Sequence, residues 1–229
     1  MVLPDAEHRA LPTSEVRGPS ATRAAAAVLG VTALACLSVQ VVLAARYGPG
    51  SSAVRVVQLF AKFPVQAVAL IAVASLAVAR RDVHARRSSG LVHAALLGSL
   101  VTLAVYLLAT PAGAPPPGPA AWSAPTALLA HYVLPGAALA GWLLLGPRRL
   151  LGPASLVAAV AWPAAWMLAV VAQAPLTAFS PYPFVDPMRA GWTPVLGDCA
   201  LVLGLLALAA AALLGLDRAR AASGHPDLG

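Results

Sequence analysis

The sequence predicts an all-α, polytopic membrane protein built as a bundle of six transmembrane helices. Of its 229 residues, 60% are hydrophobic and only 10% are charged. Soluble domains carry about 25% charged residues, so this chain has too little polar surface to cover a water-soluble globule. Its apolar residues fall into runs of about 20, which is the length that a helix needs to cross a bilayer core. The composition argues against a soluble enzyme, a nucleic-acid-binding protein and a disordered protein.

Three regions are expected along the chain. Residues 1–22 mix acidic and basic side chains with several prolines, and we expect a disordered cytoplasmic tail there. No small-residue cleavage site marks a signal peptide, so the first apolar run is expected to remain as a helix. Residues 23–216 form the six-helix transmembrane domain, and residues 217–229 form a short cytoplasmic tail.

Gly, Pro and Arg separate the six apolar runs, as is typical of tight connections between helices. The first run ends at Arg46 and a Gly-Pro-Gly turn, and the second ends at Arg80. Pro111 closes the third run, Gly146 begins the turn after the fourth, and Asp217 ends the sixth. The predicted spans are residues 24–45, 54–79, 91–110, 123–145, 154–174 and 192–216.

The basic residues predict the orientation of the bundle. Eleven arginines fall in the tails and loops of one side, whereas three fall on the other side. Cytoplasmic loops are enriched in Lys and Arg, so both termini are expected in the cytoplasm. An even number of spans requires the same arrangement. The basic set has fourteen Arg and one Lys, with many Ala and Pro, which is typical of a GC-rich bacterial genome. We therefore expect a bacterial inner-membrane protein.

Ionisable residues inside the spans are candidates for function, because each costs about 2.5–3.5 kcal/mol on insertion scales. Lys62, His131 and Asp198 lie at similar depths, roughly 9–12 Å below the outer surface at 1.5 Å per residue. One interpretation is an outward-facing polar pocket in which His131 acts as acid or base. The alternative is a buried Lys62–Asp198 ion pair, capped by His131, that only holds helices together. Other polar residues expected near this depth are Gln66, Thr102, Tyr106 and Tyr132.

Prolines are predicted to disturb two spans. Pro64 lies within the second span, and Pro135 lies one turn beyond His131. A proline in a membrane helix leaves the carbonyl four residues earlier without its partner, which can kink the helix or open a pocket. The alternative is that both are ordinary membrane-helix prolines. His93, near the start of the third span, is expected to be interfacial, and the Thr102 hydroxyl is expected to bond back to its own helix.

A set of motifs resembles a known family. His131-Tyr132-Val133-Leu134-Pro135 is followed by Gly146-Pro147-Arg148-Arg149, then by Trp162-Pro163, and in the last outer loop by Pro181-Tyr182-Pro183-Phe184. The chain is similar in these positions to the bacterial Pr-six-Pr six-helix membrane proteins. These are relatives of the androgen-induced and androgen-dependent membrane hydrolases. The similarity extends over about residues 55–215.

The resemblance implies hydrolysis of fatty-acid esters by a membrane-embedded Thr nucleophile and a His base. The His corresponds to His131, which is the predicted catalytic residue. The position of the Thr is occupied by Pro64, which has no hydroxyl, although Gln66 two residues later is retained. The substrate-binding residues expected around this site are Lys62, Gln66, Thr102, Tyr106, Tyr132, Tyr182 and Asp198.

Three functions remain open from the sequence. The first is a membrane lipid-ester hydrolase, and the second is a non-catalytic lipid-binding or scaffolding protein. The third, a small transporter, is disfavoured because the chain shows no inverted repeat. The expected partner is a membrane lipid or fatty-acyl ester, with no nucleic acid, no metal and no cofactor, because no metal-binding cluster or nucleotide-binding motif is present. The oligomeric state is not predicted.

Overall fold

The computed structural model describes residues 19–80, 86–109 and 120–223, and this part of the chain is all-α. Five helices are long and apolar enough to cross a membrane, or six if the bent pair α2 and α3 forms one span. The predicted fold class is confirmed, and the chain is an integral, multi-pass membrane protein. The elements are α1 (Pro19–Arg46), α2 (Ser52–Phe60), α3 (Phe63–Ala79), α4 (Arg86–Ala109), α5 (Ala120–Leu128), the π-helical η2 (Leu129–Val133), α6 (Leu134–Leu145), α7 (Pro153–Thr177), η3 (Pro183–Val185), α8 (Pro187–Ala190) and α9 (Trp192–Ala222).

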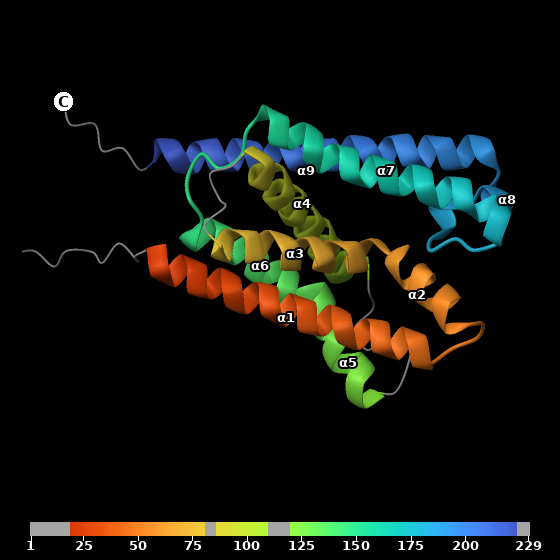
Figure 1. Ribbon diagram of the computed structural model, residues 1–229. Helices are drawn as coiled ribbons and strands as arrows, with labels where there is room; N and C mark the ends of the chain where they lie inside the picture. Colours follow the sequence, from red (N-terminus) through yellow and green to blue (C-terminus); the bar gives the residue numbers. More distant parts are fainter. Residues whose placement is uncertain (1–18, 81–85, 110–119, 224–229) are drawn as a thin grey trace, which may run out of the picture.

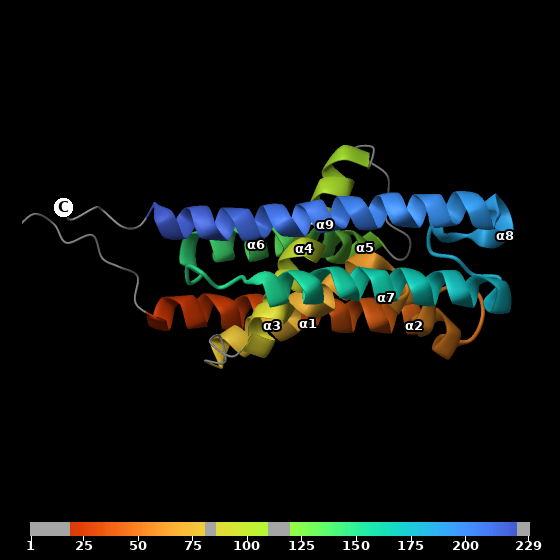
Figure 2. The same ribbon diagram turned by 90° about the horizontal axis from the view of Figure 1, so that it is seen from above.

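The bundle has two different ends. α1 begins and α9 ends at the same end, as an even number of spans requires (Figures 1 and 2). α3 and α6 also end there, and the loop into α7 carries Arg148 and Arg149. We call this the arginine-rich end. The opposite end carries α2, α8 and the loop from α7 to α9.

Helix α4 crosses the middle of the bundle and contacts α3, α6, α7 and α9. Its residues 92–99 are all buried. This part of α4 is therefore covered on every side, unlike an amphipathic helix with one exposed face. Gly98 allows close approach, because a Cβ there would lie 3.0 Å from the Cβ of Ala67 on α3. Small residues at such contacts are the usual basis of helix packing in membranes. The large side chains that remain exposed on the outside are apolar, as at Leu108, Leu144 and Leu168.

Several helices extend beyond the predicted spans, and α1 and α9 extend into the predicted tails. α1 begins at Pro19, before the predicted boundary at residue 23, and α9 continues to Ala222, past the predicted end at residue 216. The extension of α9 has a clear cause, since it contains Asp217 and Arg220, which bind the loop between α6 and α7. Residues 1–18 and 224–229 of the predicted tails lie outside the described residues.

The second predicted span is broken, contrary to the expectation of one helix over residues 54–79. α2 and α3 meet at an angle of 76°. Lys62, at the break, has an extended backbone, with φ −81° and ψ 127°. Pro64 has no N–H, and its ring clashes with the carbonyl of Phe60 four residues earlier, so a regular helix cannot pass through this point.

The fourth span is continuous but changes its winding. Residues Leu129–Val133 form a π-turn, in which the N–H of Leu134 bonds to the carbonyl of Leu129. Pro135 directly follows this turn. The proline cannot donate to the carbonyl of His131, and the wider turn accommodates the missing bond. Single π-turns inside α-helices occur frequently at functional sites, and this one contains His131.

Candidate functional site

The first candidate site lies at the π-turn, where His131 packs against Tyr106 of α4. The two rings stack with centroids 3.7 Å apart and planes 20° from parallel. The His131 Nδ1 lies 2.8 Å from the carbonyl of Ala127, so Nδ1 carries a proton and donates it. In the neutral ring this leaves Nε2 as an acceptor. Tyr132 donates its hydroxyl to the carbonyl of Tyr106 at 3.4 Å. The structure therefore brings together three of the predicted site residues.

The predicted Lys62–Asp198 ion pair does not form. Lys62 caps α3 and Asp198 lies on α9, and both side chains are exposed. Within the described residues, the salt bridge present is Arg220–Asp217. Lys62 lies within electrostatic range of His131, but Asp198 is not part of this cluster. The direction in which Asp198 faces could not be predicted from the sequence.

Gln66 has a structural role at the helix break, where its side chain binds a backbone carbonyl and an indole. Its Nε2 donates to the carbonyl of Phe60 at 2.8 Å, which is the carbonyl that Pro64 leaves without a partner. Its Oε1 accepts a hydrogen bond from Nε1 of Trp162 at 2.9 Å. The next carbonyl, that of Ala61, accepts from Nε1 of Trp166 at 2.8 Å. These bonds satisfy backbone groups that the helix break leaves without a partner in α2 or α3.

Tyr182, in the loop between α7 and α9, packs over this region. Its ring packs against Trp166 with centroids 6.1 Å apart and stacks on Phe184 at 5.6 Å. Burial raises the pKa of Tyr182 to about 12, and a hydrogen bond from the backbone of Phe63 partly opposes this shift. The phenol therefore covers the start of α3 rather than lining an open pocket.

Thr102 differs from the expectation that its hydroxyl bonds back to its own helix. Its Oγ1 is buried and has no hydrogen-bond partner among the described residues, and the side chain is 2% exposed. An unpaired hydroxyl in a protein interior is unusual, because it loses its bonds to water without replacing them. Thr102 lies four residues before Tyr106 on α4, so both face the same side of that helix.

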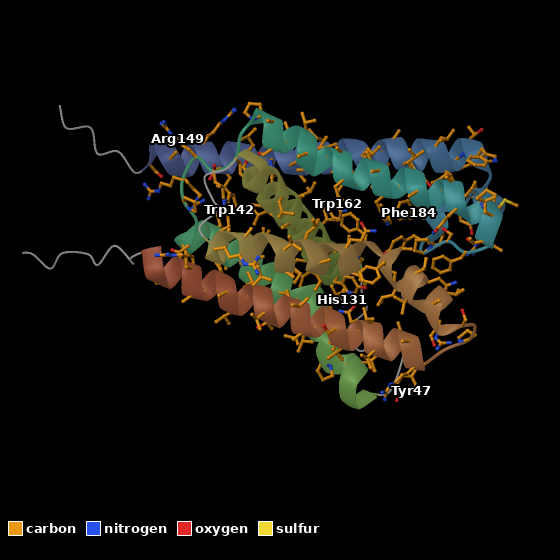
Figure 3. The ribbon with its side chains drawn as sticks, viewed as in Figure 1. Tyr47, His131, Trp142, Arg149, Trp162 and Phe184 are labelled. Atoms are coloured by element: carbon orange, nitrogen blue, oxygen red, sulfur yellow. The ribbon has the colours of Figure 1, made fainter. Side chains whose placement is uncertain are left out.

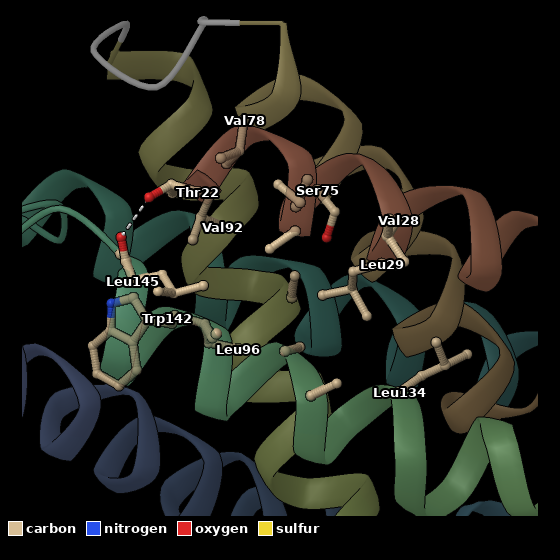
Figure 4. A pocket seen from close by; sticks show the side chains of 18 of the residues that line it. Thr22, Val28, Leu29, Ser75, Val78, Val92, Leu96, Leu134, Trp142 and Leu145 are labelled. Atoms are coloured by element: carbon tan, nitrogen blue, oxygen red, sulfur yellow. Dashed lines mark hydrogen bonds between the residues drawn. The ribbon is translucent and has the colours of Figure 1, made fainter. Parts of the chain in front are cut away.

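The larger cavity lies elsewhere, in the half of the bundle nearer the arginine-rich end. It has a volume of about 490 Å³ and lies between α1, α3, α4 and α6 (Figure 4). It extends along α1 from Thr22 to Thr32, about 15 Å at 1.5 Å per residue. Its walls are almost entirely apolar, and many are small side chains: Ala25, Ala26, Ala74, Ala95, Ala137, Ala138 and Gly141.

This cavity is open toward the outside of the bundle, between α1 and α6. Val28 of α1 and Val133, the last residue of η2 before α6, line it and are 67% and 47% exposed. Ala25 and Ala137 also line it and are exposed. The outside of a multi-pass helical bundle faces lipid, so the opening faces acyl chains rather than water. None of the predicted site residues lines this cavity. The small residues of α1 and α6 are only a weak sequence signal for it.

The surroundings of His93 differ from the interfacial position expected from the sequence. The ring is fully buried and not interfacial. Its Nε2 lies 3.0 Å from the carbonyl of Ala210, and its Nδ1 lies 3.0 Å from the hydroxyl of Ser155. The carbonyl can only accept, so Nε2 carries a proton. Neither His93 nor Ser155 lines a described cavity, and this arrangement ties α4 to α7 and α9.

The second cavity, of about 310 Å³, lies beside the helix break and α7. Gln66, Trp162 and Trp166 line it, but their polar groups already bind one another or the backbone. In the part of the chain that the structure describes, no three His, Cys, Asp or Glu residues come together as a metal site would require. The second cavity therefore supplies no reactive centre among the described residues.

Comparisons with protein families, with curated proteins and with solved structures find no match to this chain. The resemblance to the Pr-six-Pr proteins therefore stays a prediction.

Proposed function

We propose that this protein binds a membrane lipid and holds one of its acyl chains in the cavity between α1, α3, α4 and α6. The observation that carries the proposal is the cavity itself, which is apolar, about 490 Å³ in volume and open to the lipid side. Volumes of about 300–1,000 Å³ are typical of small-molecule sites. The elongated shape suits an acyl chain, and the near absence of polar lining groups disfavours a compact polar ligand.

Gly141 offers a clean test of this proposal. It lines the cavity on α6, and a Cβ placed on it would meet no heavy atom within 4 Å. Gly141→Phe should therefore fill the cavity without disturbing the backbone. Gly204, on the exposed side of α9, has the same open surroundings but does not line the cavity. Gly204→Phe is the matched control.

The experiment is native mass spectrometry of the protein released from mild detergent. We expect the wild type and Gly204→Phe to retain a bound lipid, and Gly141→Phe to lose it. Equal retention in all three proteins would contradict the proposal. A lipid-free dimer that Gly141→Phe converts to a monomer would show instead that a second copy of the chain fills the opening.

Hydrolysis of a lipid ester is the second candidate, favoured by one observation. The Thr102 hydroxyl is buried and unpaired, one helical turn from the tyrosine that stacks on His131. Because Pro64 occupies the position expected for a nucleophile, Thr102 is the hydroxyl that His131 would have to activate. Labelling by a fluorophosphonate probe that disappears in both Thr102→Val and His131→Ala would support this activity. Absence of labelling in the folded wild type would remove it.

A further inference from the structure

The loop at the mouth of the cavity has the features of a head-group site. Residues 146–152 connect α6 to α7, and we call them the mouth loop. Gly146, Pro147 and Leu150 line the cavity. Between them lie Arg148 and Arg149, which are exposed and form no ion pair within the described residues. Figure 3 shows Arg149 at the arginine-rich end, on the same side of the bundle as Trp142.

Hydrogen bonds to α9 and α1 hold the mouth loop and the end of α6 in place. Arg220 of α9 donates to the carbonyls of Leu143 and Gly146 at 2.9 and 3.2 Å. Asp217 of α9 accepts from the backbone N–H of Leu151 at 2.9 Å. Thr22 of α1 donates to the carbonyl of Leu145 at 3.3 Å, as Figure 4 shows. The two exposed arginines are thus presented by a fixed backbone rather than by a loose connection.

Arg149 adopts a backbone conformation that its residue type does not favour. Its φ is +60°, in the left-handed region where Gly and Asn are preferred. Strain of this kind is found where the surrounding structure holds a residue in place, often at binding sites. An arginine at this position gives up some stability and places a second positive charge on the loop whose neighbouring residues line the cavity.

The wall of the cavity adds an unpaired donor. Trp142 lines the cavity and is 6% exposed, and its Nε1 has no hydrogen-bond partner in the part of the chain that the structure describes. Its ring lies beside Gly146 of the mouth loop, since a Cβ on that glycine would come within 3.1 Å of the indole Cδ1. Figure 4 shows the indole at the edge of the cavity, next to Leu145.

We infer that the lipid is an anionic phospholipid, with its phosphate-containing head group bound by Arg148 and Arg149 and its acyl chain in the cavity. This inference rests on the proposed function and adds the class of lipid. Arginine binds phosphate well because its planar guanidinium donates several hydrogen bonds at once. Basic groups between transmembrane helices are known to bind the head groups of anionic lipids.

The test compares phosphatidylglycerol with phosphatidylethanolamine carrying the same acyl chains, added together to delipidated protein and measured by native mass spectrometry. We expect the wild type to prefer phosphatidylglycerol. Arg148→Asn and Arg149→Asn should each lower this preference roughly fivefold. Asn tolerates the left-handed backbone, so Arg149→Asn should fold at least as well as the wild type. Arg149→Lys should keep most of the preference.

Arg218, an exposed arginine on α9 at the same end, is the control. If Arg218→Asn lowers the preference as much as Arg149→Asn, the effect is general surface charge and the inference fails. It also fails if neither mouth-loop variant changes the preference while Gly141→Phe still expels both lipids. If Gly141→Phe expels neither lipid, the proposed function itself fails.

Discussion

The Nδ1 of His93 lies 3.0 Å from the Oγ of Ser155, in a fully buried contact between α4 and α7. Together with the bond from Nε2 to the carbonyl of Ala210 on α9, it joins three spans. A Ser–His contact can signal catalysis. Here both side chains are sealed from the described cavities, so the geometry serves the packing of the bundle.

His93→Phe should therefore destabilise the protein. The ring would still fill the space, but the carbonyl of Ala210 would lose its partner, and a buried unpaired polar group costs about 1–3 kcal/mol. Thermal unfolding in detergent measures this as a lower melting temperature. Ser155→Ala should have a smaller effect, because it leaves the bond to Ala210 intact. A melting temperature unchanged by His93→Phe would show that this bond is not significant.

Gln66→Leu tests the account of the helix break. The change leaves the carbonyl of Phe60 and the indole N–H of Trp162 unpaired. The expected loss of stability is roughly 1–3 kcal/mol, from two lost hydrogen bonds that are at most partly buried. Gln58 on α2 has no described hydrogen bond, and Gln58→Leu makes the same chemical change there. The two variants should differ clearly in melting temperature, and equal values would contradict a stabilising role for Gln66.

Arg55 fixes the corner between α1 and α2. Its guanidinium donates to the carbonyls of Ala44, Ala45, Gly48 and Gly50. A lysine cannot reproduce this planar set of donors, so Arg55→Lys should loosen the corner and expose it to limited proteolysis. Arg46→Lys, at an exposed position without such bonds, is the control. Equal cleavage rates in the two variants would contradict the role of Arg55 in fixing this corner.

Tyr182 predicts a dependence of stability on alkaline pH. Burial raises its pKa in the folded protein to about 12, from the ordinary value of 10.0 for a tyrosine. Below about pH 10 the phenol is neutral in both states and its contribution is complete. That contribution is lost as the pH rises from about 10 through about 12, because the unfolded chain releases the proton first. In Tyr182→Phe, melting temperature should fall less across this window. Parallel curves for the two proteins would contradict the burial of the phenol.

Much of the fold could be predicted because it depends on composition and length. Runs of about 20 apolar residues must form helices in a bilayer, and the structure has helices at all six runs. Even the break in the second span had a sequence signal, since Pro64 removes one backbone donor. Its angle depended on partners far along the chain, Trp162 and Trp166, whose roles no local pattern reveals.

The candidate sites were harder to predict, because depth in the membrane does not give direction. The structure brings His131, Tyr106 and Tyr132 together, whereas Asp198, expected beside them, is exposed on α9. His93 is buried near a helix start, where an interfacial position was expected. The cavity is a volume that small side chains on four helices leave empty, and it depends on how those helices cross.

The central claim is that an acyl chain enters the bundle. The most direct measurement uses a phospholipid with a photoactivatable group in its acyl chain, with the labelled residues identified by mass spectrometry. Leu96 lines the cavity and is 3% exposed, so lipid at the outer surface of the bundle cannot reach it. The account predicts labelling at Leu96 and Ser75 that Gly141→Phe removes. Labelling confined to outer residues such as Leu144 and Leu168 would contradict it.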